Sequence, residues 1–311
     1  MKKLSIVVPV FNEEANISIF YNRIADMLKT SEVMDWEMIF VDDGSWDKSR
    51  QIIKEIIKKD GRIKLISLTR NFGQQSAMTA GMDYASGDII ITMDCDLQDP
   101  PELIPQMLSE LKDEVLVVFA RRRSRKDGFF KKLSAGLYYA ILRRFSDIKI
   151  TGNIGDFRMI DRRVLSELKN MREKSRYLRG MVAWLGFNYT IVDYDRPNRL
   201  HGKTGFSYNK MLRLAMDGIL NFSLLPLRIG MLIGSLSILV GSFFLAYMGL
   251  DILFTDVSYP LYKWLIVVLF VLIGFLFVLI WIIAEYVGKI YDESKGRPLY
   301  VIHDRENFEQ A

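Results

Sequence analysis

The chain has 311 residues and a mass of 36.1 kDa; 50% of its residues are apolar and 25% are charged, with one cysteine and two histidines. This composition excludes a disordered chain, a disulfide-stabilised scaffold and a zinc site built from cysteine and histidine. Residues 1–228 hold 37 Lys and Arg against 29 Asp and Glu, a net charge of +8, so we expect this part to meet an anionic substrate or surface.

Short apolar runs and amphipathic stretches alternate through the first 120 residues. Runs rich in valine and isoleucine predict strands at 4–10, 37–41, 64–68, 89–93 and 115–120. Apolar residues at helical spacing predict helices at 14–28, 47–58, 74–84 and 102–111, the second of them capped by Ser45 and Asp47. Strands that alternate with helices are typical of a doubly wound, mostly parallel α/β sheet, which binds ligands at the carboxyl ends of its strands.

Beyond residue 125 this alternation stops. Large apolar residues recur every four positions from Phe129 to Phe145, with lysine and arginine on the flanks, which predicts an amphipathic, cationic helix. Such a helix suits the bilayer interface, and packing against the sheet is the alternative. Residues 208–222 predict a second helix of this kind.

Two segments without a charged residue follow, at 229–250 and 264–284. Their lengths of 22 and 21 residues suffice to cross about 30 Å of hydrocarbon, so they predict two transmembrane helices, with a buried hairpin of core helices as the alternative. The residues between them hold a single cation, whereas several cations flank the pair: Arg213, Arg228, Lys289, Lys295 and Arg297. The positive-inside rule then places both termini in the cytosol and the chain in the cytoplasmic membrane.

Three polar side chains directly follow the strand predicted at 89–93: Asp94, Asp96 and Gln98. Two carboxylates two residues apart at a strand end can face one site, and with an amide they supply the oxygen ligands that Mg²⁺ or Mn²⁺ prefers. Such a metal keeps coordination positions open for phosphate oxygens. The alternative is a solvated turn, because such turns are also rich in acidic residues.

The first two predicted strands also end at acidic or amide groups, within residues 9–13 for the first and at Asp42 and Asp43 for the second. Carboxylates there can accept hydrogen bonds from the base N–H groups and ribose hydroxyls of a nucleotide. No G-x-G-x-x-G follows a strand, which argues against a redox dinucleotide. Residues 202–204 resemble the end of a P-loop, but Pro197 stands where its first glycine belongs, which excludes that motif.

Six stretches of the chain carry a family resemblance: VVPVFNEE (7–14), VDDGSWD (41–47), LTRNFGQQSAMTAGMDYASGD (68–88), MDCDLQDPPE (93–102), GDFRMIDR (155–162) and AEYVGKIYDESKGRPLY (284–300). Together they resemble family 2 glycosyltransferases, and within them the polyprenyl-phosphate glycosyltransferases that include dolichyl-phosphate mannose synthases and bactoprenol glucosyltransferases. The resemblance covers nearly the whole chain and implies a sheet of the GT-A type. The two predicted spans resemble the bactoprenol glucosyltransferase branch more than the soluble mannose synthases.

The resemblance also implies roles for the residues at the strand ends. The nucleotide would be held by Pro9, Phe11, Glu13, Asp42, Asp43 and Asp94. The divalent ion, Mg²⁺ or Mn²⁺, would be held by Asp94, Asp96 and Gln98, and through it the diphosphate. A metal that neutralises charge on this leaving group lowers the barrier, so we expect activity to require it.

The acceptor implied by the resemblance is a lipid monophosphate. Asp156 occupies the position usually given the role of base, and it either takes a phosphate proton or orients the nucleophile and Arg158; capping a helix is its structural alternative. Arg121 and Arg122 are candidates to clamp the acceptor phosphate, because guanidinium groups match phosphate oxygens. In the basic segment 196–207, which resembles the mobile acceptor loop of the family, Arg199 and Lys203 would close over the diphosphate.

These expectations divide the chain into four parts. Residues 1–125 form the nucleotide-sugar-binding α/β half, and 126–228 form the acceptor half with its interfacial helices and acceptor loop. Residues 229–284 form the transmembrane hairpin, and 285–311 form a cytosolic tail. Glycines within the first span would permit close helix packing, and the resemblance suggests a homo-oligomer such as a tetramer.

The function that the resemblance implies is inverting transfer of a hexose from a UDP-sugar to undecaprenyl phosphate at the cytosolic face, which gives a β-linked lipid-phosphate sugar. Glucose is the expected sugar, and GlcNAc, mannose and an aminoarabinose-type sugar are the alternatives. A processive polysaccharide synthase is disfavoured because the chain has no Q-x-x-R-W motif and too few spans for a polymer channel. A membrane scaffold without activity is disfavoured by the crowded acids, and no nucleic-acid partner is expected.

Overall fold

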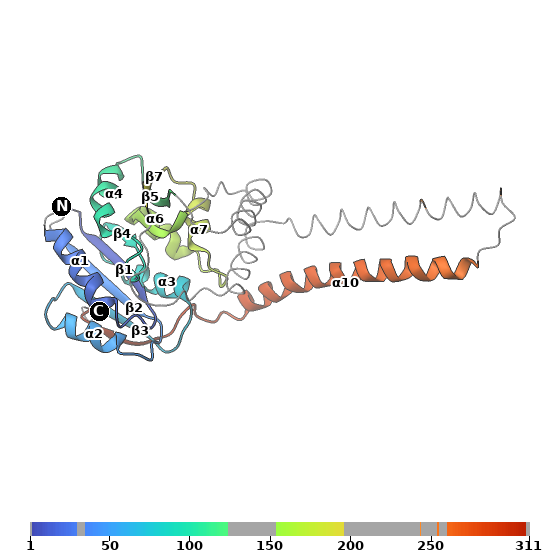
Figure 1. Ribbon diagram of the computed structural model, residues 1–311, viewed down its shortest axis with the longest axis horizontal. Coiled ribbons are helices and arrows are strands. Elements are labelled where there is room, and N and C mark those ends of the chain that lie inside the picture. The colour runs from blue at the N-terminus through green and yellow to red at the C-terminus, as the bar shows by residue number, and fades with distance from the viewer. Residues whose placement is uncertain are drawn as a thin grey trace.

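The computed structural model describes residues 2–29, 35–123, 154–195 and 260–308, together with residues 243 and 254 (Figure 1). Its strands form one eight-stranded sheet in the order β7-β5-β6-β4-β1-β2-β3-β8. The strands are β1 (Leu4–Val10), β2 (Trp36–Asp42), β3 (Ile63–Leu68), β4 (Ile89–Thr92), β5 (Val117–Arg122), β6 (Ile154–Asp161), β7 (Tyr189–Tyr194) and β8 (Ile302–Glu306). The helices are α1 (Ile17–Lys29), α2 (Ser49–Ile57), α3 (Gln74–Tyr84), η1 (Pro101–Leu103), α4 (Ile104–Glu110), α6 (Arg162–Asn170), α7 (Leu178–Trp184) and α10 (Leu261–Ser294).

The sheet is mostly parallel, as the alternation of strands and helices predicts. Strands β4, β1, β2 and β3 pair in parallel, as do β5 and β7, whereas β6 runs antiparallel to both β4 and β5, and β8 runs antiparallel to β3. The carboxyl ends of β1, β2, β4 and β5 therefore lie along the same edge. The antiparallel β6 begins at this edge, so the first residues of β6 join the last residues of its neighbours.

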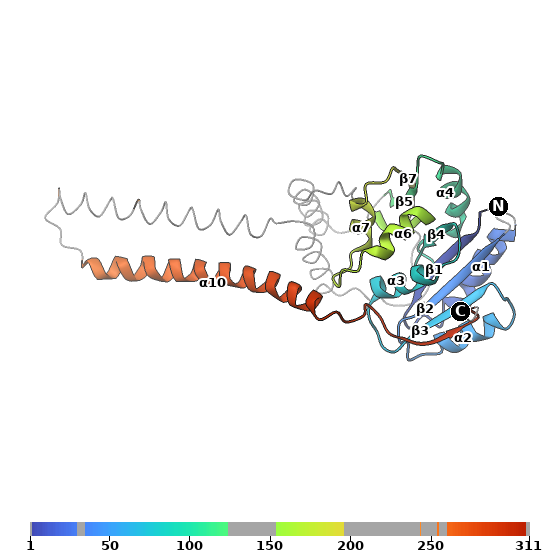
Figure 2. The ribbon, with the colours of Figure 1, turned by 180° about the vertical axis from the view of Figure 1, so that it is seen from behind.

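Helices cover both faces of the sheet, which makes the fold doubly wound. Helices α1, α2 and α4 bury apolar side chains in one cluster with β1, β2 and β3, including Phe20, Ile24 and Ile53. Helices α3, α6 and α7 bury theirs in a second cluster on the opposite face, including Met78 and Leu165 (Figures 1 and 2). Burial of each such side chain contributes about 1.5–3 kcal/mol to the free energy of unfolding. The two clusters therefore stabilise the strands whose ends carry the polar residues.

Helix α3 packs unusually close to the sheet. A Cβ at Gly81 would lie 2.3 Å from Val7 Cγ1 and 3.0 Å from Val41 Cγ2, so glycine is required for this approach to β1 and β2. The helix begins at Gln74, in the connection that follows the carboxyl end of β3. Its first turn therefore lies at the polar edge of the sheet, and its remaining turns anchor it to the strands.

The elements predicted within residues 1–123 are confirmed with small shifts of their ends. Of the two caps expected for α2, Asp47 accepts a hydrogen bond from the amide of Ser49 at 2.9 Å, whereas Ser45 accepts one from Asn12 instead. The sequence pattern did not predict β6, β7, β8, α6 or α7. The expected interfacial helices at 129–145 and 208–222, the acceptor loop and the first span lie outside the described residues.

Helix α10 contains the second predicted span and projects away from the α/β domain (Figure 1). Across the parts of the chain that the structure describes, no helix meets the length and apolarity needed to cross a membrane. The two transmembrane helices therefore stay a prediction.

The segment after α10 returns to the domain and adds β8 to the edge of the sheet beside β3 (Figure 2). Tyr300 donates a hydrogen bond to Asp83 Oδ2 at 2.8 Å, which attaches this segment to the last turn of α3. Asn307 donates to the carbonyl oxygens of Gly61 and Ile63, both at 2.7 Å. Strands from residues 1–123, 154–195 and 302–306 thus share one sheet, and the four-part division of the chain stays a prediction.

Candidate active site

The candidate active site lies where β1, β2 and β4 end and β6 begins. Asp94 and Asp96 follow β4, and Asp156 is the third residue of β6. The hydroxyl of Thr92, the last residue of β4, donates to the carbonyl oxygen of Asp156 at 2.6 Å, which joins the two segments. The edge therefore brings Asp94 and Asp156 together, although 62 positions separate them in the chain.

The loops after β1 and β2 are fixed to each other by reciprocal hydrogen bonds. The amide of Asn12 donates to Ser45 Oγ at 3.0 Å, and the amide of Trp46 donates to Asn12 Oδ1 at 3.1 Å. The amide of Glu13 donates to Ser49 Oγ at 2.9 Å. Asn12 has a φ of 57°, a left-handed conformation that asparagine tolerates better than most residues. The two loops consequently form one rigid unit at the edge.

Three predicted nucleotide-binding residues belong to this unit. Pro9 is half-buried near the end of β1, and Phe11 is 36% exposed with its ring edge-to-face against Trp46, 5.0 Å between centroids. The carboxylate of Glu13 accepts a hydrogen bond from Asn16 at 2.5 Å. Phe11 and Trp46, which is 80% exposed, offer apolar ring surface beside polar groups, a combination that suits a nucleoside.

The two neighbouring acids at the end of β2 have different partners. Asp42 is fully buried and accepts two hydrogen bonds from the guanidinium of Arg50, at 2.8 and 3.0 Å. Asp43 accepts the backbone amides of Phe72 and Gly73, at 2.7 and 2.9 Å. Burial raises the pKa of Asp43 to about 6, although these two amides oppose the shift. Asp42 thus holds α2, whereas Asp43 holds the loop that leads into α3.

The predicted metal ligands lie in a turn that the chain itself organises. The amide of Gln98 donates to Asp96 Oδ1 at 3.1 Å, and the amide of Asp94 donates weakly to Asp99 at 3.4 Å. Leu97 adopts a φ of 60° between them, an unusual conformation for a leucine that this hydrogen-bonded turn imposes. Asp96 and Asp99 are both buried.

These residues fit a divalent cation. Burial, followed by the nearby carboxylates of Asp99 and Asp96, raises the pKa of Asp94 well above its usual value. A bound cation relieves such crowding, because it favours the ionised form of each carboxylate. In the described part of the chain, no group of three or more His, Cys, Asp or Glu side chains is arranged as a complete metal cage. The set of two carboxylates and one amide would leave coordination positions for a ligand's oxygens, as Mg²⁺ sites usually do.

Asp156 lies against two arginines. Arg158 Nη2 is 3.4 Å from Asp156 Oδ1, and Arg179 Nη2 is 3.7 Å from Asp156 Oδ2. Burial raises the pKa of Asp156, but Arg179 and Arg158 outweigh it and hold that pKa below its usual value. Asp156 is therefore an ionised carboxylate and a weak base at neutral pH. Arg158 is 1% exposed, and its Nη1 has no hydrogen-bond partner among the described residues.

The two arginines predicted to clamp the acceptor have different surroundings. Arg121 forms a two-point salt bridge with Asp193 of β7, at 2.6 and 2.8 Å. Arg122 Nε donates to the hydroxyl of Tyr194 at 3.2 Å, and its Nη2 would be 3.2 Å from a Cβ placed on Gly155, next to Asp156. Arg122 thus belongs to the acid-rich edge, whereas Asp193 engages Arg121. Arg199 and Lys203 lie outside the described residues.

Several site residues were missed by sequence reasoning. Gln74 donates to Asp94 Oδ1 at 2.6 Å, and Gln75 donates to Asp156 Oδ2 at 3.3 Å. Arg179 comes from α7, and Tyr194 donates to Asp99 at 2.8 Å. The two glutamines lie within the stretch 68–88 that carries the family resemblance, which was the available signal for them. Arg179 and Tyr194 had no such signal, because only the folded sheet brings α7 and β7 to this edge.

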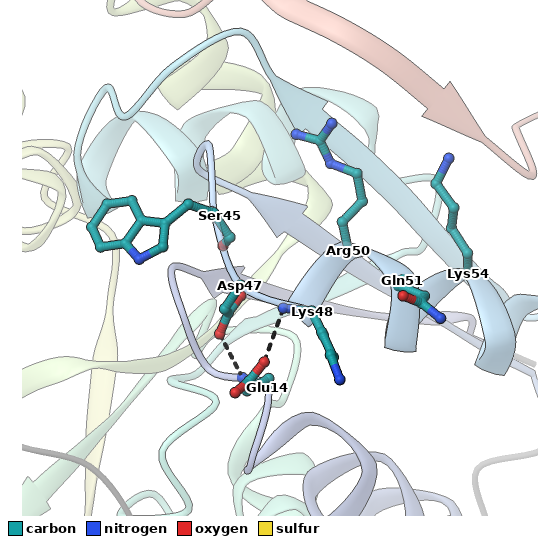
Figure 3. Close-up of a pocket in the computed structure, with 8 residues that line it drawn as sticks. Glu14, Ser45, Asp47, Lys48, Arg50, Gln51 and Lys54 are labelled. Atoms are coloured by element: carbon teal, nitrogen blue, oxygen red, sulfur yellow. Dashed lines mark hydrogen bonds between the residues drawn. The ribbon is translucent and has the colours of Figure 1, made fainter.

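A groove of about 690 Å³ lies beside α2, and its lining includes Ser45 and Trp46 of the loop after β2 (Figure 3). Figure 3 shows Glu14 joined to Asp47 and Lys48 by hydrogen bonds across it. Asp94, Asp96 and Asp156 are absent from its lining, and two of its three cations have partners within the chain: Arg50 pairs with Asp42 and Lys54 with Glu306. We therefore assign the chemistry to the acid-rich edge and not to this groove.

Known proteins share this organisation of sequence. The family model for glycosyl transferase family 2 matches residues 5–169. The chain is 44% identical over 299 residues to the uncharacterized glycosyltransferase YkcC of Bacillus subtilis, covering 96% of this chain and 92% of that protein. It is 39% identical over 303 residues to the prophage bactoprenol glucosyl transferase homolog of Escherichia coli K12, covering 96% and 98%. It is 38% identical over 311 residues to the bactoprenol glucosyl transferase of Shigella phage SfV, covering 98% and 99%. The chain is a glycosyltransferase and belongs to glycosyltransferase family 2.

Proposed function

We propose that this enzyme transfers glucose from UDP-glucose to a polyprenyl phosphate, with undecaprenyl phosphate as the acceptor. Two relatives that match nearly the whole chain carry the name bactoprenol glucosyl transferase or its homolog, which supports both the sugar and the acceptor class. The observation that carries the proposal is the close placement of two kinds of group. Carboxylates suited to a cation, Asp94 and Asp96, lie at the same edge as two arginines that flank Asp156, the buried Arg158 and the half-buried Arg179.

The donor side of the site consists of the loops after β1, β2 and β4. Phe11 offers ring surface to the base, and Asp43 offers a carboxylate to a base N–H or a ribose hydroxyl. Asp94, Asp96 and Gln98 would hold Mg²⁺ or Mn²⁺ next to the diphosphate. When bound, this ion supplies positive charge that stabilises the departing nucleoside diphosphate.

The acceptor side consists of β6, α7 and the end of β5. An acceptor phosphate whose second pKa is about 6 is mostly dianionic at pH 7, so it does not need a strong base. Asp156, with its lowered pKa, acts by orienting Arg158 and Arg179 and not by removing a proton. The half-buried Arg179 and Arg122 hold the phosphate oxygens, while the buried Arg158 pairs with Asp156. One phosphate oxygen attacks the anomeric carbon directly and displaces the nucleoside diphosphate, which inverts the configuration.

The site of this reaction in the cell follows from the acceptor. Undecaprenyl phosphate resides in a bilayer, and we extend the proposal to a protein anchored in the cytoplasmic membrane by the two predicted spans. The α/β domain and both termini would then face the cytosol, where UDP-sugars are made. A homo-oligomer such as a tetramer is part of the same proposal and is tested by cross-linking in native membranes, where a monomer alone would refute it.

The test is transfer of radiolabel from UDP-glucose, and in parallel from UDP-GlcNAc, to undecaprenyl phosphate by the detergent-purified full-length chain. We expect label in the organic phase from UDP-glucose with Mn²⁺ or Mg²⁺ and none with EDTA. Asp96→Asn should lower the rate at least 100-fold, because it removes a charged ligand of the ion while preserving side-chain volume. The matched control is Asp113→Asn, the same change at an exposed position remote from the site.

Label from UDP-GlcNAc and none from UDP-glucose would replace the sugar but preserve the reaction. No lipid label from either donor would refute transfer of these two sugars. Equal rates for Asp96→Asn and the wild type would refute the assignment of the ion to this turn.

A further inference from the structure

Two adjacent glutamines at the start of α3 contact the two carboxylates on opposite sides of the site. Gln74 Nε2 donates to Asp94 Oδ1 at 2.6 Å, and Gln75 Nε2 donates to Asp156 Oδ2 at 3.3 Å. Asp94 belongs to the donor side and Asp156 to the acceptor side. One helical turn therefore touches both halves of the site.

The second amide also holds a third element. Gln75 Oε1 accepts the backbone amide of Leu178, the first residue of α7, at 3.0 Å. Helix α7 carries Arg179, which pairs with Asp156. The side-chain amide of Gln75 thus links two groups: its NH2 contacts Asp156, and its oxygen contacts the first residue of α7, the helix that supplies Arg179. These contacts fix Asp156 and α7 relative to α3.

Helix α3 is well suited to act as a fixed reference for these contacts. Its close approach to β1 and β2 at Gly81 leaves no room for displacement toward the sheet. Gly73, just before its first turn, donates its amide to Asp43 Oδ2 at 2.9 Å. The glutamines project from a turn that is anchored on both sides.

The chemistry of an amide explains why glutamine suits these positions. A lysine could also donate to these carboxylates. At position 74 its charge would compete with a divalent cation at Asp94, and at position 75 it would add a third positive charge next to Asp156, which already pairs with Arg158 and Arg179. An amide donates a hydrogen bond without adding charge. Gln74 engages one oxygen of Asp94, so the second oxygen can still bind a cation.

We propose that Gln74 and Gln75 are positioning residues that set the spacing between the donor and acceptor halves of the site, Gln74 through Asp94 and Gln75 through Asp156 and α7. This inference rests on the proposed function. It assigns the two residues separable roles, because Gln74 contacts Asp94 on the donor side of the site and Gln75 contacts Asp156 on the acceptor side. Separable roles distinguish positioning from a general contribution to folding.

The test compares Gln74→Met, Gln75→Met and Gln75→Glu in the full-length enzyme, with Gln51→Met on the exposed face of α2 as the matched control. Methionine preserves length and removes the amide. We expect Gln74→Met to raise the KM for the UDP-sugar about tenfold, the equivalent of 1.4 kcal/mol, with little change in the KM for the lipid phosphate. Gln75→Met should raise the KM for the lipid phosphate about tenfold, with little change in the KM for the UDP-sugar.

Gln75→Glu provides a sharper variant. Its carboxylate can still accept the Leu178 amide, so α7 stays attached, but it repels Asp156 instead of donating to it. We expect a raised KM for the lipid phosphate and an unchanged melting temperature. A wild-type KM for the acceptor in this variant would overturn the role of Gln75.

Binding measurements keep the inference testable apart from turnover. By calorimetry, Gln74→Met should weaken binding of UDP with Mn²⁺ about tenfold, and Gln75→Met should weaken binding of farnesyl phosphate but not of UDP. If the wild type transfers no sugar, the proposed function fails, while these binding differences still decide the inference. Equal effects of both methionine variants on both ligands, or no effect, would overturn it.

Discussion

Asp43 combines a raised pKa with a position just after β2, in the part of the site that we propose binds the nucleoside. Burial raises its pKa to about 6, so its folded-state pKa lies above the value of about 3.9 expected in an unfolded chain. Because ionising Asp43 costs more free energy in the folded chain than in the unfolded chain, its contribution to the free energy of unfolding declines as the pH rises from about 4 to about 6. Binding has the opposite dependence, because a hydrogen bond from a nucleoside N–H favours the ionised carboxylate.

We therefore expect uridine to bind more weakly at pH 5 than at pH 7.5, with a midpoint near 6. Uridine is the suitable probe because it lacks phosphates and avoids the metal site. The measurement is calorimetric affinity across this range for the wild type and for Asp43→Asn, which cannot titrate. A midpoint near 6 that persists in Asp43→Asn would show that another group is responsible.

Arg179 and, next to it, Arg158 oppose the effect of burial on the Asp156 carboxyl and hold its pKa below the usual value. Arg158→Met should therefore raise the pKa of Asp156. If the ionised form is needed to orient the acceptor, the variant should lose activity as the pH falls from 7 to 5 more steeply than the wild type does. The measurement is the kcat profile against pH. Arg163→Met, which removes an exposed arginine paired with Asp161, is the control and should leave the profile unchanged.

At the scale of the element, the position of α3 depends on one glycine. In Gly81→Ala the new methyl would meet Val7 Cγ1 at 2.3 Å, so either the strand side chains or the helix must shift. Overpacking of this kind costs about 1–3 kcal/mol, partly offset by the better helix propensity of alanine, about 1 kcal/mol.

We expect Gly81→Ala to lower the free energy of unfolding and to raise both substrate KM values, because displacement of α3 moves both glutamines. Gly61→Ala is the matched control, since no atom lies within 4 Å of its Cβ position and its φ is not left-handed. Urea unfolding and steady-state kinetics check both variants. Wild-type stability in Gly81→Ala would mean that the core relaxes without moving the helix.

The elements also show what the sequence could predict. The strands and helices of residues 1–123 follow apolar periodicity, and Gln74–Tyr84 was predicted to the residue. β8, with the sequence IHDRE, has no apolar face because it covers an edge, so no pattern reveals it. β6 carries a buried arginine within its strand, which hides it from an apolar pattern.

The candidate site also contains some residues that the sequence could predict and others that it could not. Asp94 and Asp96 were predicted because they follow an apolar strand within a recognisable motif, and Asp156 was predicted from its motif alone, since it lies inside β6. Their partners, Gln75 and Arg179, were not predicted, because their contacts join α3 and α7 to β6 and exist only in the folded chain. The sequence could not distinguish the roles of Arg121 and Arg122, because only the structure shows that Arg121 pairs with Asp193.

At the scale of the whole molecule, the single cysteine allows the proposed membrane topology to be tested. Cys95 is buried, and burial raises the pKa of its thiol well above the usual value, so it should react slowly with maleimides. In a Cys95→Ala background, we expect Asp256→Cys, between the predicted spans, to react with a membrane-impermeant maleimide on spheroplasts. His303→Cys should react only after lysis. Labelling of both variants on intact spheroplasts, or of His303→Cys alone, would contradict the prediction that both termini lie in the cytosol.

The late position of β8 in the chain orders the events of folding. β8 occupies residues 302–306, so it leaves the ribosome after the catalytic strands and after both predicted spans. Until then the edge of β3 has unpaired backbone groups, a surface on which other chains can pair. The edge of β3 is therefore covered only after residues 302–306 have been synthesised, and a chain that stops before residue 302 would leave the backbone groups of this edge unpaired.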